Sequence, residues 1–150
     1  MKKQQGGFTL IELIMVIVIL GILAAFALPK FVNLGSDARK ATLQGAYGSV
    51  KSASALTHAS WLAKNDTAAN SVTVEGGTVT MIATSGYPAA SAIADAAGVT
   101  SADYSITTAA GTTTIQAKGA TTPASCQVSY AEPAATAGAV PAISIVDTGC

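Results

Sequence analysis

The residue with the most unusual chemical setting is Glu12, a carboxylate inside an otherwise apolar run near the N-terminus. The run extends from Phe8 to Leu28, which is 21 residues. Its members that are not plainly apolar are Thr9, Glu12 and Gly21. About 20 apolar residues suffice to cross the hydrocarbon core of a bilayer. A carboxylate in such a segment costs a few kcal/mol and is by default a functional hypothesis. The run therefore predicts a spanning helix in which Glu12 serves a function.

The rest of the chain offers little for catalysis. It contains no G-x-x-x-x-G-K-[ST], no G-x-S-x-G and no H-E-x-x-H. Its single histidine, His58, falls in a predicted helix, where a structural or solvated role is expected. Four acidic residues are scattered without the spacing of calcium ligands; they are Asp95, Asp103, Glu132 and Asp147. We therefore expect no enzyme, no cofactor and no metal site.

A short basic tail precedes the apolar run. Met1 to Gly7 contains Lys2 and Lys3, which suits a cytoplasmic end under the positive-inside rule. Gly6 and Gly7 leave the Gly7–Phe8 bond extended and unhindered. A protease acting at the membrane face could therefore reach this bond.

The segment Gly7-Phe8-Thr9-Leu10-Ile11-Glu12 resembles the class III signal of type IV prepilins and type II secretion pseudopilins. The resemblance is specific because the basic leader, glycine, phenylalanine, glutamate and apolar run all occur in order. It implies that a membrane prepilin peptidase cuts after Gly7 and N-methylates Phe8. It also implies that cytoplasmic ATPases and an inner-membrane platform drive assembly.

Cleavage would give Glu12 a partner. The new amino group at Phe8 carries a positive charge, and a buried carboxylate is tolerated when it is paired. In a lone subunit Glu12 could use its own amine, lipid headgroups or water; in a filament it could pair with the Phe8 amine of a neighbour. The second arrangement would make Glu12 a register device. The alternative is a tolerated polar residue that snorkels to the membrane surface.

An ordinary secretory signal is the competing interpretation of the run. Ala25-Phe26-Ala27 is a small-x-small site after which a signal peptidase could cut. However, signal h-regions have about 7–15 residues and lack carboxylates. N-terminal sequencing separates the two cases, because the mature chain would begin at Phe8 or at Leu28.

Pro29 follows the apolar run and removes a helical hydrogen bond to the Ala25 carbonyl, which favours a kink. Gly21 and Pro29 bracket a segment suited to local unwinding. The resemblance implies the same, since pilin filaments melt this part of the helix on assembly, and Pro29 matches the family's proline position. We expect Phe8, Glu12, Gly21 and Pro29 to be the assembly residues.

Helical periodicity continues to about residue 60. A helix over 8–60 would extend about 80 Å. One stripe consists mostly of small residues, so that a sheet or a neighbouring helix could approach closely. It contains Phe31, Leu34, Ala38, Ala41, Gly45, Gly48, Ser52, Ala55 and Ala59. A second face mixes contact residues with solvated ones and contains Lys40, Leu43, Tyr47, Val50 and Ser54.

Beyond Trp61 the pattern changes to short strands and turns. Hairpins are predicted for 71–75 with 78–82 and for 104–107 with 112–116. The buried face of the first would be Val72, Val74, Val79 and Met81. A turn at Tyr87-Pro88, a short helix over 89–97 and strands near 126–130 and 143–146 complete the expectation. This pattern predicts an α+β fold in which the helix covers a small antiparallel sheet. The predicted parts are a leader over 1–7, an assembly helix over 8–60 and a globular head over 61–150.

Two cysteines in an exported chain predict one disulfide rather than a metal site. Cys126 and Cys150 would close a loop of 25 residues. The resemblance extends here, because type IVa pilins carry a C-terminal disulfide-bounded region. The runs Pro29-Lys30-Phe31-Val32-Asn33-Leu34, Asp37-Ala38-Arg39, Gly86-Tyr87-Pro88 and Thr148-Gly149-Cys150 resemble the mannose-sensitive haemagglutinin (MSHA) branch.

The expected function is that of a type IV pilin, a major subunit held in the bacterial inner membrane with its head in the periplasm. It would then polymerise with copies of itself into an extracellular fibre for adhesion or attachment to a host or surface receptor. The alternatives are a type II secretion pseudopilin and a membrane-tethered periplasmic binding module. The formal charge of the whole chain is zero. Removal of the leader would leave six basic and eight acidic residues, so no nucleic-acid partner is expected.

Overall fold

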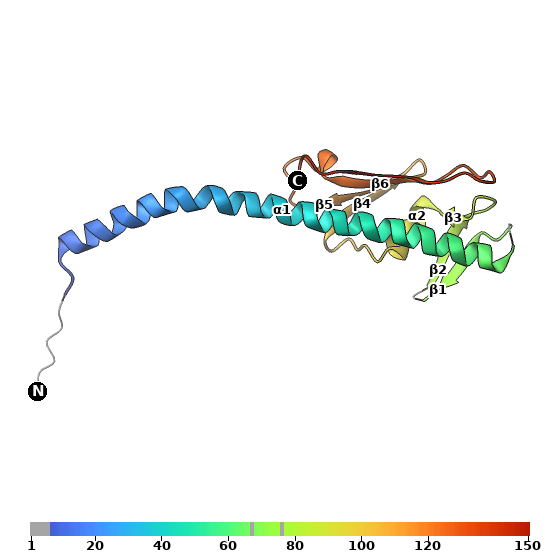
Figure 1. Ribbon diagram of the computed structural model, residues 1–150, viewed down its shortest axis with the longest axis horizontal. Helices are drawn as coiled ribbons and strands as arrows, with labels where there is room; N and C mark the ends of the chain where they lie inside the picture. Colours follow the sequence, from blue (N-terminus) through green and yellow to red (C-terminus); the bar gives the residue numbers. More distant parts are fainter. Residues whose placement is uncertain (1–6, 67, 76) are drawn as a thin grey trace, which may run out of the picture. The chain divides into compact units, whose positions relative to one another are not determined.

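The structure is a computed structural model that describes residues 7–66, 68–75 and 77–150, with only the backbone described at 28–33. The chain divides into two compact units, Met1–Ser36 and Asp37–Cys150, which we describe separately. Helix α1 (Leu10–Lys64) begins in the first unit and ends in the second (Figure 1). All strands of the described residues belong to the second unit.

The two ends of α1 have local causes. At its start, the Leu13 N–H donates to the Thr9 carbonyl, so Thr9 is the N-cap residue. At its end, Asn65 adopts φ 50° and its N–H donates to the Leu62 carbonyl, 3.1 Å away. Asparagine is among the residues that tolerate this left-handed conformation. The helix therefore stops at Lys64, about one turn later than the sequence predicts.

Backbone at Gly21 and Pro29 is helical. The kink expected at Pro29 concerns 28–33, whose side chains lie outside the described residues, and it stays a prediction. Over Leu10–Ala27, α1 exposes large apolar side chains on every side, and Glu12 is the one charged residue of this range. One helix among the described residues, over Leu10–Ala27, is long and apolar enough to cross a membrane by length and composition.

In the second unit, α1 packs through a different face from the one that its small residues suggested. The predicted small-residue stripe is exposed at every position from Leu34 to Ala59, and Phe31 lies outside the described residues. The buried positions of the helix are Leu43, Ala46, Val50, Ala53, Ser54, Thr57 and Trp61. Burying Leu43 and Val50 removes more apolar surface from water than burying glycine and alanine would. The small-residue stripe therefore does not contact the sheet.

The first sheet has three strands in the order β1-β2-β3. They are β1 (Ser71–Val74), β2 (Gly77–Ile82) and β3 (Tyr87–Pro88), and both pairings are antiparallel. Val72, Val79 and Met81 pack around Trp61 of α1, which confirms most of the predicted buried face; Val74 is half-buried. Tyr87-Pro88 forms a short edge strand rather than only a turn, and proline is tolerated there because it lacks only an outward N–H.

The second sheet has four antiparallel strands in the order β4-β5-β6-β7. They are β4 (Tyr104–Ala109), β5 (Thr112–Ala117), β6 (Gln127–Ala131) and β7 (Ala142–Val146). β4 and β5 meet in a two-residue turn in which Ala110 and Gly111 both have positive φ, as a type I′ hairpin requires. Ile115, Val128 and Tyr130 pack against Leu43 and Val50, so α1 covers one face of this sheet.

Helix α2 (Ala90–Ala96) joins the two sheets through polar contacts. The Ala90 N–H donates to the Glu132 carboxylate at 2.6 Å, and the Tyr130 hydroxyl donates to the Pro88 carbonyl at 2.7 Å. Burial, with the Glu132 charge as a smaller cause, raises the pKa of the Tyr130 phenol, which therefore remains a neutral donor. The helix ends at Gly98, which has φ 66°. A long apolar helix, small antiparallel sheets and a C-terminal disulfide confirm the predicted α+β fold.

Candidate functional site

The Glu12 side chain is hydrogen-bonded to Thr9. One carboxylate oxygen accepts from the Thr9 backbone N–H at 2.9 Å and from the Thr9 hydroxyl at 2.8 Å. In return, the Glu12 N–H donates to the Thr9 hydroxyl oxygen at 3.3 Å. This reciprocal pattern is a capping box, in which an N-cap threonine and a glutamate three residues later satisfy each other's N–H groups. Glu12 therefore has neutral partners within its own chain.

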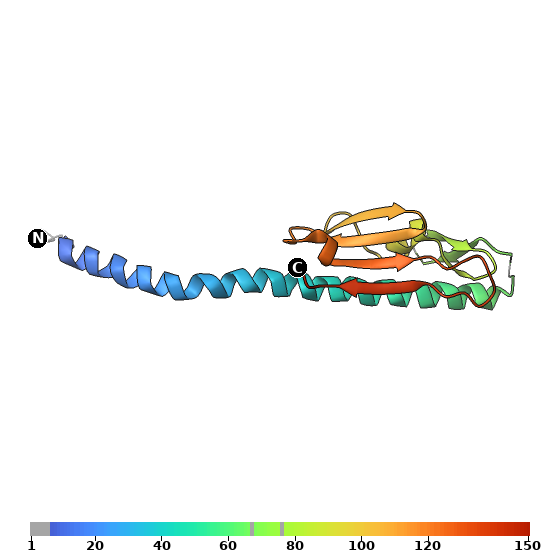
Figure 2. The same cartoon turned by 90° about the horizontal axis from the view of Figure 1, so that it is seen from above.

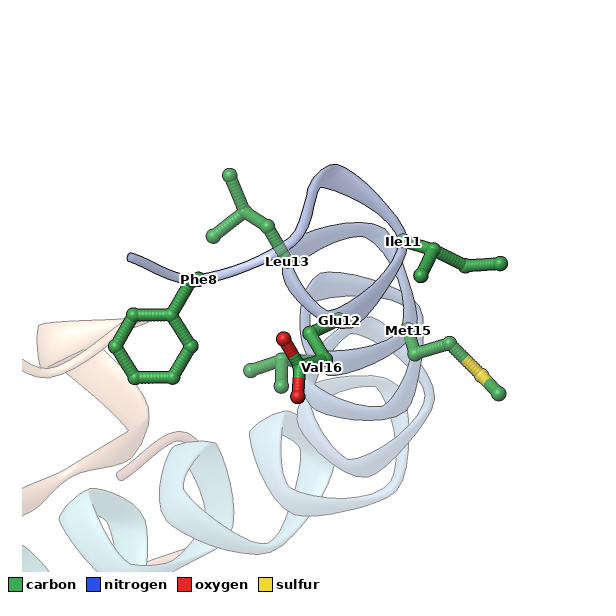
Figure 3. Close-up of a pocket in the computed structure, with 6 residues that line it drawn as sticks. All are labelled: Phe8, Ile11, Glu12, Leu13, Met15 and Val16. Carbon is green, nitrogen blue, oxygen red and sulfur yellow. The ribbon is translucent and has the colours of Figure 1, made fainter. Parts of the chain in front are cut away.

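The surroundings of this carboxylate are apolar and exposed. A hollow of about 600 Å³ beside the first turns is lined by Phe8, Ile11, Glu12, Leu13, Met15 and Val16. Figure 3 shows that Phe8 and Glu12 project to one side of the helix, whereas Ile11 and Met15 project to the other. The Phe8 side chain is 91% exposed. Within the described part of the chain, this apolar surface has no packing partner.

The predicted processing and assembly residues are only partly brought together. Phe8 and Glu12 line the same hollow, but the Phe8 nitrogen is still part of the peptide bond to Gly7, so a charged partner for Glu12 arises only on cleavage. A methyl group added at Gly7 or at Gly21 would meet nothing within 4 Å. Gly21 and Pro29 lie further along α1, and the side chain of Pro29 is outside the described residues. Their assembly roles stay predictions.

Thr9 is the functional residue that the sequence analysis missed. The signal was present, because Thr9-Leu10-Ile11-Glu12 has the T-x-x-E spacing of a capping box ahead of an apolar run. A carboxylate in an apolar run, however, predicts an ionic partner. The structure supplies a local partner instead.

The capping box predicts the effect of replacing Thr9 by valine. The loss of an N-cap hydroxyl costs about 1 kcal/mol, which corresponds to roughly fivefold more frequent opening of the first turn. Hydrogen exchange of the amides of residues 10–13, measured by NMR on the full chain in detergent micelles, should speed up by that factor. Thr9→Ser keeps the hydroxyl and should exchange at the original rate. Equal rates in all three proteins would contradict a stabilising capping box.

The predicted disulfide is present at the other end of the chain. Cys126 and Cys150 are bonded, with a Cα–Cα distance of 4.9 Å, and both are buried. The Arg39 Nε donates to the Cys150 carbonyl at 2.7 Å, which ties this end to α1. At Gly149 a methyl group would lie 2.7 Å from the Thr122 carbonyl oxygen, so the approach requires glycine.

His58 has a packing role. Its ring stacks on Tyr87 at a centroid distance of 4.0 Å, and its Nδ1 lies 2.8 Å from the Gly86 carbonyl. A carbonyl only accepts, so Nδ1 carries the proton. No group of three or more His, Cys, Asp or Glu side chains that could hold a metal occurs in the described ranges. The acidic residues Asp95, Asp103, Glu132 and Asp147 are not brought together as a ligand set.

Comparison with known proteins identifies the N-terminal segment. Residues 2–28 match the family described as the prokaryotic N-terminal methylation motif. The match contains Gly7, Phe8, Glu12 and the whole candidate membrane span. The N-terminal segment of this chain thus carries a prokaryotic N-terminal methylation motif.

Curated relatives are similar to a limited part of this chain. The type IV narrow pilus major component PilA5 of Thermus thermophilus is 49% identical over 53 residues, which is 35% of this chain and 46% of that protein. The type IV major fimbrial protein FimA of Dichelobacter nodosus is 42% identical over 53 residues, 35% of this chain and 34% of FimA. The type II secretion system core protein G of Pseudomonas aeruginosa is 46% identical over 44 residues, 29% of this chain and 31% of that protein.

The chain thus matches less than half the length of these curated relatives. No solved structure was found to match it. The family match over residues 2–28 concerns the apolar run and the short segment before it.

Proposed function

We propose that this chain is a structural subunit of a type IV pilus, anchored in the bacterial inner membrane before assembly and extracellular afterwards. The observation that carries the proposal is the pilin-type methylation motif on an apolar helix whose side chains are exposed on every side. Exposed apolar surface of this extent requires lipid or other protein to cover it. A bilayer covers it before assembly, and the helices of neighbouring subunits cover it in the fibre.

The exposed stripe of α1 in the second unit supports helix packing between subunits. Gly45, Gly48, Ser52, Ala55 and Ala59 are all exposed and carry no charge. Small residues on a helix let another backbone approach closely. Because the sheet of the same chain packs on the opposite face, this stripe is free for a neighbouring subunit.

In this proposal the motif residues have defined roles. A prepilin peptidase cuts between Gly7 and Phe8 and methylates the Phe8 amine, and Glu12 exchanges its Thr9 contacts for the Phe8 amine of a neighbour. Gly21 and Pro29 permit the helix between them to unwind during packing. Residues 1–7 are then the leader, 8–60 the assembly helix and 61–150 the head. A surface or host receptor and a pilus assembly machinery are the further partners.

The test is to shear surface fibres from cells that produce the chain and to analyse their subunits by mass spectrometry. The expected subunit begins at Phe8, carries one added methyl group and retains one disulfide. A mature chain that begins at Leu28 would overturn the proposal in favour of secretory processing. Cells with membrane-bound protein but no fibres would overturn it in favour of an anchor.

A type II secretion pseudopilin is the second candidate, because the core protein G of Pseudomonas aeruginosa is 46% identical to this chain over 44 residues. The disulfide-closed C-terminal region favours the pilin, and the sequence runs quoted above suggest its MSHA branch. The two candidates differ in the fibre that they form, since a pseudopilus is short and periplasmic whereas a pilus extends from the cell surface. Long surface fibres at natural expression would exclude the pseudopilin.

A further inference from the structure

The four-stranded sheet has two free edges, formed by β4 and β7. In Figure 2 these strands form opposite sides of the sheet. An unpaired edge exposes N–H and C=O groups that can pair with another chain. The hydrogen bonds of the sheet determine which of these groups point outward.

At the β4 edge, the outward groups belong to alternate residues. The Tyr104 N–H donates to the Thr100 carbonyl at 3.3 Å, outside the sheet, so Tyr104 faces away from β5. Antiparallel ladders alternate inward and outward groups along a strand. Ile106 and Thr108 therefore also direct their backbone N–H and C=O groups outward.

At the β7 edge, the hydrogen bonds of β6 determine which groups of β7 point outward. The Ala117 N–H donates to the Cys126 carbonyl and the Glu132 N–H donates to the Gly111 carbonyl, so even-numbered residues of β6 bond to β5. Its odd-numbered residues must then bond to β7, where their partners are Ala142, Ser144 and Val146. Ile143 and Ile145 are left with outward N–H and C=O groups.

Neither edge carries the usual protection against pairing. Soluble proteins commonly blunt free edges with lysine or other charges, proline or bulges. The sequences Tyr-Ser-Ile-Thr-Thr-Ala of β4 and Ala-Ile-Ser-Ile-Val of β7 contain no charged residue and no proline. Threonine and isoleucine instead favour strand pairing.

The direction of the strands suits copies that share one orientation. All neighbouring strands are antiparallel, so β4 and β7 run in opposite directions. When a second copy is placed beside the first in the same orientation, its β4 lies antiparallel to β7. A contact between two different surfaces of the same chain generates an open helical filament when its rotation does not close into a ring.

We infer that β7 of one subunit pairs with β4 of the next in the fibre, with Ile143 opposite Thr108 and Ile145 opposite Ile106. This register pairs the outward N–H and C=O groups of Ile106, Thr108, Ile143 and Ile145. A shift of two residues toward Tyr104 would place Ile145 opposite a residue whose N–H is already bonded. The inference rests on the proposed pilus function and adds the surface by which heads join and the partner, a second copy of the chain.

The register predicts one close contact that can be trapped. Ser144 and Thr107 of the next subunit would face each other as a non-hydrogen-bonded pair, in which Cα atoms are about 4.5 Å apart. Within one chain these residues are three strand spacings apart, about 14 Å, which is too far for a disulfide. Fibres of the Thr107→Cys, Ser144→Cys double variant should, after mild oxidation, convert from monomers to a ladder of dimers and longer oligomers on a non-reducing gel.

Three matched variants define the outcome. Thr107→Cys alone and Ser144→Cys alone should stay monomeric, as should Ser105→Cys with Ser144→Cys, which is displaced by about 7 Å along the strand. Monomers from double-variant fibres, or dimers from Thr107→Cys alone, would overturn the pairing while leaving the pilus function intact. Absence of fibres from the unaltered chain would instead overturn the proposed function.

A charge comparison covers the case in which the cysteine variants do not assemble. Like charges directly opposite each other in a sheet are destabilising, whereas opposite charges are favourable. Thr107→Lys with Ser144→Lys should lower fibre yield, and Thr107→Lys with Ser144→Glu should restore it. Equal yields from these two variants would contradict the pairing.

Discussion

Replacing Glu12 by alanine should leave the chain in the membrane and reduce fibre yield by about 100-fold or more. Removal of one partner from a buried ion pair costs about 3–5 kcal/mol, because the other charge is left unpaired. In the proposed fibre that other charge is the Phe8 amine of a neighbouring subunit. Before cleavage the same substitution removes only the neutral hydrogen bonds to Thr9, so retention in the membrane should be unaffected.

The measurement is the amount of sheared fibre relative to membrane-bound subunit, at matched expression and with complete cleavage checked by mass spectrometry. Glu12→Gln is the control that separates charge from capping. Its amide oxygen can still accept from Thr9, but it cannot form an ion pair. Normal yield from Glu12→Gln together with loss in Glu12→Ala would assign Glu12 to capping alone. Normal yield from both variants would remove Glu12 from assembly.

Removing the disulfide should have the largest effect on the stability of the second unit. A loop of 25 residues closed by Cys126 and Cys150 contributes about 3–4 kcal/mol in the chain-entropy model. Cys126 and Cys150 are both buried in the main core cluster, and the Cys150 carbonyl accepts from Arg39. A Cys126→Ser, Cys150→Ser variant should therefore lower the melting temperature by about 10–20 °C.

Circular dichroism of the full chain in detergent micelles measures this, because the strands melt separately from a micelle-protected helix. Arg39→Gln is a matched variant that weakens the attachment to α1 and keeps the disulfide. It should lower the melting temperature by no more than about 5 °C, as the loss of one hydrogen bond predicts. If the disulfide-free variant melted at the same temperature as the unaltered chain, the disulfide would be dispensable for the fold.

Local chemistry made several elements predictable from the sequence. The length and apolarity of 8–28 predict a helix whatever surrounds it, because helical hydrogen bonds are local. The Glu75 to Gly77 and Ala109 to Gly111 turns predict the two hairpins, since turn residues set the register of adjacent strands. The cleavage site after Gly7 rests on a short linear segment of the sequence, and it stays a prediction.

Tertiary structure decided what depends on contacts between distant residues. Both faces of α1 have helical spacing, so periodicity could not tell whether Leu43 and Val50 or the small residues would meet the sheet. The greater apolar area of Leu43 and Val50 favoured them. The two sheets are tied together by contacts between residues 42 positions apart, from Glu132 to Ala90 of α2 and from Tyr130 to Pro88 of β3. The sequence by itself thus determined the membrane-length apolar helix and the hairpins. Only packing determined which surfaces remain free for a neighbouring subunit, because burial is a property of the whole fold.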